Sequence, residues 1–155
     1  MIKKLAQYLI LILIAFAPLS AFSQTLIDGS NIDEIVVTAR QFGSATLSYQ
    51  ADRNPKIIGK IDNIPYSIRF RNCSTQFICE DMNFRVGFLI KPTSEIINKW
   101  NQAKRFSRAY LDNEGDAILE MDIILQGGIS EANLSETFSY WRLSLAGFTS
   151  HIGFK

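Results

Sequence analysis

The segment Ile96–Ser130 constrains the fold most, because it holds a helix, a β-hairpin and the start of another helix in one uninterrupted run. Apolar residues from Ile96 to Ala103 recur at helical spacing directly after Ser94, a residue type that favours helix starts. Alternating apolar and polar residues then flank the turn-forming sequence Asp112–Gly115, which predicts two antiparallel strands joined by a hairpin. The segment specifies an architecture, and its residues do not pair a nucleophile with a base.

A long amphipathic helix follows. Gly127 and Gly128 interrupt the second strand, and Ser130 can cap the N-terminus of the helix. Large apolar residues then recur at alternating steps of four and three residues, which places them on one face: Leu134, Phe138, Trp141, Leu145, Phe148 and Ile152. We expect this face to pack on the apolar face of the sheet. The alternative is that part of it is offered to a second subunit or a ligand.

The first half of the chain contains one helix and a meander of strands. Residues 31–42 carry apolar side chains at helical spacing, with Ser30 as the expected N-cap, and residues 46–49 form either a short strand or part of a connection. From Lys56 the period changes to two, and residues 56–61, 66–71 and 82–90 predict three consecutive antiparallel strands. Together the elements predict an α+β domain, an antiparallel five-stranded sheet with three helices in the order α-β-β-β-α-β-β-α.

Residues 1–23 have the features of a secretory signal peptide. Lys3 and Lys4 precede an apolar run, and Ala21-Phe22-Ser23 supplies a cleavage site with small residues. The alternative is an uncleaved membrane anchor, which needs about 20 apolar residues, a length that this run reaches only by counting polar residues and a proline. We expect cleavage after Ser23 and one exported domain, residues 24–155, with no membrane attachment. It would be periplasmic in a Gram-negative bacterium.

The charge of the chain argues against nucleic acid as a partner. The formal net charge of the full chain is +1, and it falls by two when Lys3 and Lys4 are removed. Domains that bind nucleic acid carry clustered Lys and Arg, whereas the charges of this domain are interspersed. Arg69, Arg71 and Arg85 make only a small basic cluster, which we expect to be a solvated strand face.

Cys73 and Cys79 are the only two cysteines. Five residues separate them between two predicted strands, a spacing that suits a disulfide across the end of a hairpin in an oxidising compartment. A redox-active pair would prefer a Cys-x-x-Cys motif at a helix start, and a zinc site would need two further ligands. We therefore expect an intramolecular disulfide.

The sequence matches no catalytic or metal-binding pattern, so we expect no enzymatic activity, cofactor or metal. His151, the only histidine, has no nearby Cys or second His. The acidic run Asp112–Asp116 does not fit an EF-hand, because the first calcium ligand would fall on Tyr110, and a hairpin turn explains the run. Glu120 and Asp122 lie on one face of a strand, about 7 Å apart by strand rise, and we expect both to be exposed.

Three aromatic residues, Trp100, Tyr110 and Trp141, have two candidate roles. Packing in the core is the default, with the indole N–H and phenol O–H groups finding hydrogen-bond partners. If the domain binds a peptide or a second copy, we expect its contact residues among these aromatics and the apolar face of the last helix: Trp100, Tyr110, Leu134, Phe138, Trp141, Leu145 and Phe148.

The order of elements is that of the type III secretion chaperone-like fold. An ordered set of residues between about Lys56 and Gly153 resembles the YbjN-type domain family, which is sometimes described as a bacterial sensory transduction regulator. The residues that carry the resemblance are Ile97-Asn-Lys-Trp-Asn101, Arg105-Phe106, Ala109-Tyr110-Leu111-Asp112, Gly115-Asp116, Leu119-Glu120-Met121-Asp122, Gly127-Gly128-Ile129-Ser130, Asn133-Leu134, Phe138, Trp141 and His151-Ile152-Gly153. The Cys pair is similar to the pair in exported members of the family.

The resemblance implies no catalytic residues for this chain, because the family has no established ones, and an analogy with proteins of similar fold suggests a function through contacts. Chaperones of similar fold dimerise and bind extended client segments on apolar surfaces, in some cases by adding a strand to a sheet. We therefore expect an exported, non-enzymatic module, chaperone-like or regulatory, that binds a protein or peptide partner through apolar and sheet-edge contacts. The alternative is an envelope structural or stress protein whose homodimer is the functional state.

Overall fold

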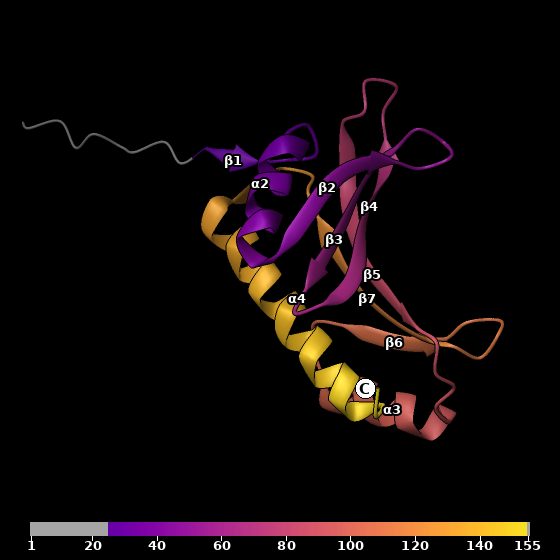
Figure 1. The fold of residues 1–155 in the computed structure, drawn as a ribbon. Coiled ribbons are helices and arrows are strands. Elements are labelled where there is room, and N and C mark those ends of the chain that lie inside the picture. Colours follow the sequence, from indigo (N-terminus) through magenta and orange to yellow (C-terminus); the bar gives the residue numbers. More distant parts are fainter. Residues whose placement is uncertain (1–24, 155) are drawn as a thin grey trace, which may run out of the picture.

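The computed structural model describes residues 25–154, which form three helices and two antiparallel sheets (Figure 1). The signal peptide expected in residues 1–23 lies outside the described residues. The larger sheet has six strands, in the spatial order β2 (Ser44–Tyr49), β3 (Pro55–Ile61), β4 (Ile64–Cys73), β5 (Cys79–Phe88), β7 (Ala117–Ile124) and β6 (Arg108–Leu111). The expected count of five strands was wrong, because residues 44–49 pair with β3 along their whole length.

The meander of β3, β4 and β5 forms as its alternating pattern predicts. Asp62 and Asn63 both take positive φ, at 49° and 67°, as a tight hairpin between β3 and β4 requires. Cys73 at the end of β4 pairs directly with Cys79 at the start of β5, and the two are joined by a disulfide. The predicted disulfide is thus confirmed.

The helices α2 (Ile32–Phe42) and α4 (Glu131–His151) lie on one side of the large sheet, and α3 (Ser94–Ala103) lies at the β6 edge beside the C-terminal end of α4 (Figure 1). Ser130 caps α4 as expected, since its side chain accepts a hydrogen bond from the backbone N–H of Asn133. The expected cap of α2 was wrong: Asn31 occupies that position, and the Ser30 hydroxyl instead donates to Asp28.

The core lies between α4 and the inner face of the sheet. Phe84 of β5 packs against Phe138 and Trp141 of α4, with ring centroids 5.1 and 5.4 Å apart. The whole apolar face of α4 is buried, as expected for a helix packed on a sheet. The indole N–H groups of Trp100 and Trp141 were expected to find hydrogen-bond partners, yet both are buried without one.

A second, two-stranded sheet joins the start of the described chain to the start of α4. β1 (Leu26–Ile27) pairs antiparallel with β8 (Ile129–Ser130). Between β1 and α2, Gly29 passes so close to the disulfide that an added Cβ would lie 1.7 Å from the carbonyl oxygen of Cys79. Glycine at this position therefore allows the N-terminal segment to dock on the Cys73–Cys79 hairpin.

Candidate functional site

In the part of the chain that the structure describes, no helix lies over the outer face of the large sheet, because α2 and α4 pack on the inner face and α3 lies at the β6 edge (Figure 1). Side chains of alternate residues point to this open face. From β3 to β6 they include Lys56, Ile58, Lys60, Ser67, Arg69, Arg71, Asp81, Asn83, Arg85, Ile118, Glu120, Asp122, Arg108 and Tyr110. Most are charged or polar, so the open face is the main polar surface that the sheet presents.

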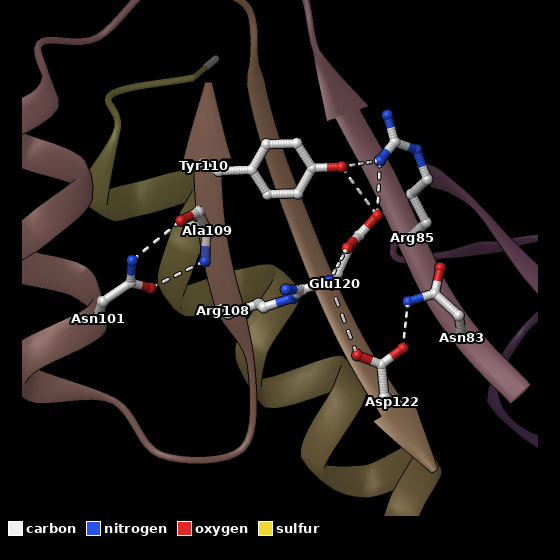
Figure 2. A network of polar contacts seen from close by, with 8 residues as sticks. All are labelled: Asn83, Arg85, Asn101, Arg108, Ala109, Tyr110, Glu120 and Asp122. Atoms are coloured by element: carbon white, nitrogen blue, oxygen red, sulfur yellow. Dashed lines mark hydrogen bonds and ion pairs between the residues drawn. The ribbon is translucent and has the colours of Figure 1, made fainter. Parts of the chain in front are cut away.

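Glu120 is the centre of a hydrogen-bond network on the β5–β7–β6 half of this face (Figure 2). Arg85 donates to its Oε1 at 2.6 Å, the Tyr110 hydroxyl donates to the same oxygen at 2.9 Å, and Arg108 donates to Oε2 at 2.9 Å. Arg85 also donates to the Tyr110 hydroxyl oxygen. The cross-strand register explains the arrangement, because Glu120 lies directly opposite Arg85 on β5 and Arg108 on β6.

The network sets the ionisation of its members. Burial raises the pKa of Glu120, whose side chain is only 5% exposed, but the hydrogen bonds from Arg85 and Tyr110 and the charge of Arg85 outweigh burial and bring the pKa below its ordinary value. For Arg85, burial acts to lower the pKa, but the same contacts with Glu120 and Tyr110 raise it overall. Glu120 is therefore a stable carboxylate with both oxygens occupied by donors, an arrangement that suits structure better than proton transfer.

The expectation that Glu120 is exposed was wrong, although Asp122 on the same strand face is exposed as expected. Asp122 lies 3.9 Å from Arg108 and accepts a hydrogen bond from the Asn83 side-chain amide at 2.7 Å. The difference between the two acids comes from their neighbours, since three long side chains surround Glu120 and cover it.

The strand register gives the arginines of the predicted basic cluster, Arg69, Arg71 and Arg85, different cross-strand neighbours. Arg85 is paired with Glu120, and Arg71 lies opposite Asp81. Arg69 lies between Asn83 on one side and Lys56 on the other, so one of its cross-strand neighbours carries a like charge. The three arginines therefore do not act as one group.

One edge of the large sheet is closed by a side chain. The backbone of Ala109 in the edge strand β6 faces outward, and the Asn101 side chain of α3 makes two hydrogen bonds with it (Figure 2). The amide nitrogen of Asn101 donates to the Ala109 carbonyl at 2.9 Å, and its oxygen accepts from the Ala109 N–H at 2.8 Å. These are the two bonds that an added strand would make at this residue.

The other edge, β2, is longer and uncharged, with the sequence Ser-Ala-Thr-Leu-Ser-Tyr. Gln50 donates its backbone N–H to Asn54 in the hairpin to β3, which by alternation turns the backbone groups of Tyr49, Leu47 and Ala45 outward. Arg40 donates to the Ala45 carbonyl at 3.0 Å. Within the described residues, the outward groups of Leu47 and Tyr49 have no such partner, so this edge can accept another strand.

The residues expected to contact a partner have mostly been placed in the core. Trp100, Leu134, Phe138, Trp141, Leu145 and Phe148 are each at most 1% exposed. They stabilise the helix layer and offer no surface on the folded chain. Tyr110 is the exception: instead of packing in the core it lies, half-buried, in the Glu120 network on the open face.

A hollow with a volume of about 630 Å³ adjoins the disulfide hairpin. Asp28, Cys73, Cys79, Glu80 and Gln126 are among its lining residues. Across residues 25–154, no three His, Cys, Asp or Glu side chains gather closely enough to hold a metal ion. None of the helices in that range has the length and apolar character needed to cross a bilayer.

Asn101 and Lys56 are the surface residues whose roles the sequence did not reveal. Asn101 forms part of the family-like run after Trp100, but a single asparagine gives no signal that it will bond a strand edge. Lys56 looks like an ordinary solvated strand residue until the register places Arg69 opposite it. The Lys56 contact depends on the alignment of β3 with β4, and the Asn101 contact depends on the placement of α3 at the β6 edge.

Comparison with models of protein families identifies the family of this chain. The family model YbjN, described as "Putative bacterial sensory transduction regulator", matches residues 31–154, from the start of α2 to the end of the described chain. No curated protein and no solved structure matches the chain.

Proposed function

Because the chain belongs to the YbjN family, we propose that it is an exported, non-enzymatic regulatory module. It binds a protein partner by adding an extended segment of that partner to the β2 edge. The match covers nearly all of the described residues, so the proposed regulatory role is assigned to the domain as a whole. The likeness to the type III secretion chaperone fold belongs to the same proposal, since such chaperones bind extended clients.

The contrast between the two sheet edges carries the proposal. At β6 the edge strand is short, and Asn101 uses the outward backbone groups of Ala109. At β2 the edge strand has six residues without charge or proline, and the backbone groups of Leu47 and Tyr49 face outward. Proteins commonly protect such edges with charges, proline or a covering element, so an unprotected one favours strand addition.

Export is supported by two independent features. Residues 1–23 have the pattern of a cleavable signal peptide, and the described domain contains a disulfide between Cys73 and Cys79. Structural disulfides form and persist in oxidising compartments such as the bacterial periplasm. The periplasm or another extracytoplasmic space is therefore the proposed location.

Crosslinking in the native envelope tests the proposal. The full chain with its signal segment would be expressed in its source organism as wild type, Leu47→Pro and Leu47→Val, and adducts identified by mass spectrometry. Proline removes the outward N–H of Leu47 without touching the β2–β3 ladder, whereas valine keeps that N–H. We expect a defined protein adduct with the wild type and Leu47→Val and its loss with Leu47→Pro.

Two results would contradict strand addition at β2. One is an adduct that survives in a folded Leu47→Pro protein, with folding checked by circular dichroism. The other is an adduct that contains only two copies of this chain, which would support the homodimer as the functional state, since the uncharged β2 edge can also pair with itself about a twofold axis. Mass spectrometry of the proteolytic peptides from the same sample also reports whether the mature chain begins at Gln24.

A further inference from the structure

Three basic side chains form a group on the open face, on the β3–β4 half next to the β2 edge. Lys56 and Lys60 project from β3, and Arg69 projects from β4 directly opposite Lys56. Within the described residues, none of the three side chains takes part in an ion pair or a side-chain hydrogen bond. We call this group the basic patch.

The basic patch lacks the compensation found on the rest of the same face. On the β5–β7–β6 half, Arg85 and Arg108 share the carboxylate of Glu120, and Arg108 also approaches Asp122. On the β3–β4 half, Lys56 meets Arg69 instead of an acid. Like charges directly opposite on paired strands are destabilising, so this half of the sheet carries an electrostatic cost that an anionic partner would remove.

The basic patch also has an apolar centre. Ile58 projects from β3 midway between Lys56 and Lys60 and is 49% exposed. The two lysines are about 13 Å apart by strand rise, and Ile58 lies halfway between them. The order along the strand is therefore basic, apolar, basic, with Arg69 adding a second cation at the Lys56 end.

We propose that the basic patch binds an extended acidic segment of the protein partner, with acidic residues at its first and fifth positions and an apolar residue at its third. An extended chain aligned with β3 presents alternate side chains to the sheet at the same spacing as Lys56, Ile58 and Lys60. The carboxylates then meet the cations, and the apolar side chain covers Ile58. This inference rests on the proposed protein-binding function and supplies the chemistry of the partner.

Two fluorescein-labelled peptides of equal composition and charge test the proposal by fluorescence anisotropy. One is Gly-Glu-Thr-Val-Thr-Glu-Gly, which has the required spacing, and the other is Gly-Glu-Glu-Thr-Thr-Val-Gly, which does not. We expect the spaced peptide to bind the mature protein more tightly, by about tenfold, and to weaken as salt is added. Equal binding of both peptides, or no binding of the spaced peptide at millimolar concentration, would overturn the proposal.

Charge reversal locates the site. Lys56→Glu and Lys60→Glu should each weaken binding of the spaced peptide by about tenfold or more. Lys104→Glu is the matched control, because it changes the net charge equally at the end of α3, in the helix layer, and it should leave the affinity unchanged. An equal loss in all three variants would show that only net charge matters, and the proposal would fail.

An anionic membrane is the rival occupant. Vesicles of phosphatidylcholine with phosphatidylglycerol that bind through Lys56 and compete with the spaced peptide would overturn the proposal in favour of a lipid surface. Crosslinking in the native envelope distinguishes this inference from the proposal that the partner adds a strand at the β2 edge. Loss of the partner with Leu47→Pro but not with Lys56→Glu keeps strand addition and rejects the acidic segment, and the reverse result keeps the acidic segment and rejects the β2 edge.

Discussion

Asn101 on α3 uses both hydrogen-bonding groups of its side-chain amide on the backbone of Ala109 in β6, and so occupies the place of a seventh strand (Figure 2). The contact fastens α3 to the sheet and closes one edge at the same time. An asparagine amide suits this role because it presents one donor and one acceptor, as a peptide group does.

Asn101→Ala should lower the free energy of unfolding by about 1–2 kcal/mol, because it leaves the N–H and C=O of Ala109 without their protein partners. It should also raise the tendency to self-associate, since the β6 edge becomes free. Urea unfolding and sedimentation would measure the two effects. Asn98→Ala is the control: Asn98 is an exposed residue of the same helix, and an equal effect there would show that helix propensity, not the edge contact, is responsible.

Glu120→Gln should destabilise the protein by about 1–3 kcal/mol, because it leaves the partly buried guanidinium of Arg85 without its counter-charge. Asp122→Asn, two residues along the same strand face, should cost about 0.5 kcal/mol or less, because Asp122 is exposed. Urea unfolding of both variants provides the comparison. Equal losses would mean that the Glu120 network does not contribute beyond surface charge.

Acid should remove the contribution of the Glu120 carboxylate to the stability of the folded protein. Its pKa in the folded protein lies below the ordinary value of 4.5, so the unfolded state binds the proton more tightly and the folded state is favoured when the carboxyl is ionised. This stabilisation is complete above pH 4.5 and is lost as the pH falls through the lower folded value. Urea unfolding over a pH series should therefore show the free energies of unfolding of the wild type and Glu120→Gln converging as the pH falls. A difference between them that stays constant with pH would contradict this prediction.

Reduction of the disulfide should lower the free energy of unfolding by about 2 kcal/mol, as expected for the short loop that it closes. Amide exchange should speed up at Cys79 and along β1, because the Cys79 N–H donates to the Gly29 carbonyl and the N-terminal segment docks there. Chemical denaturation with and without dithiothreitol, followed by hydrogen–deuterium exchange, measures both. A Cys73→Ala/Cys79→Ala double variant serves as control and should not respond to dithiothreitol.

Two residues of α4 test whether its apolar face is core or contact surface. Phe138 is fully buried, and Phe138→Ala should cost about 3–5 kcal/mol by leaving a cavity. Leu143, on the same helix, is 68% exposed, and Leu143→Ala should change stability by about 0.5 kcal/mol or less. Thermal unfolding of both variants separates the roles, because a true contact surface would tolerate the change at Phe138.

The sequence was most informative where one periodic pattern determines one face. The apolar residues of α4 and the alternating residues of β4 and β5 were placed correctly, because a helix and a strand each repeat at a fixed period. The disulfide followed from the position of Cys73 and Cys79 at a hairpin end.

The sequence was least informative where pairing between distant strands decides the outcome. Residues 44–49 carry a weak alternating pattern, and only their alignment with β3 makes them the edge strand β2. Glu120 reads as an exposed strand acid until the register brings Arg85 and Arg108 beside it from two different strands. Burial of a charge depends on its neighbours, and a local pattern does not contain them.

The pairing of Leu26 with Ser130 indicates the order in which parts of the domain can fold. Leu26 lies at the start of the described chain and Ser130 lies just before α4, so β1 has no partner until the residues that precede α4 are present. Closing so long a loop carries an entropic cost, which makes the pairing of β1 with β8 a late event in folding. A chain that crosses a membrane with its N-terminus first would therefore arrive with β1 still unpaired, and the last helix would bring the strand that locks it in place.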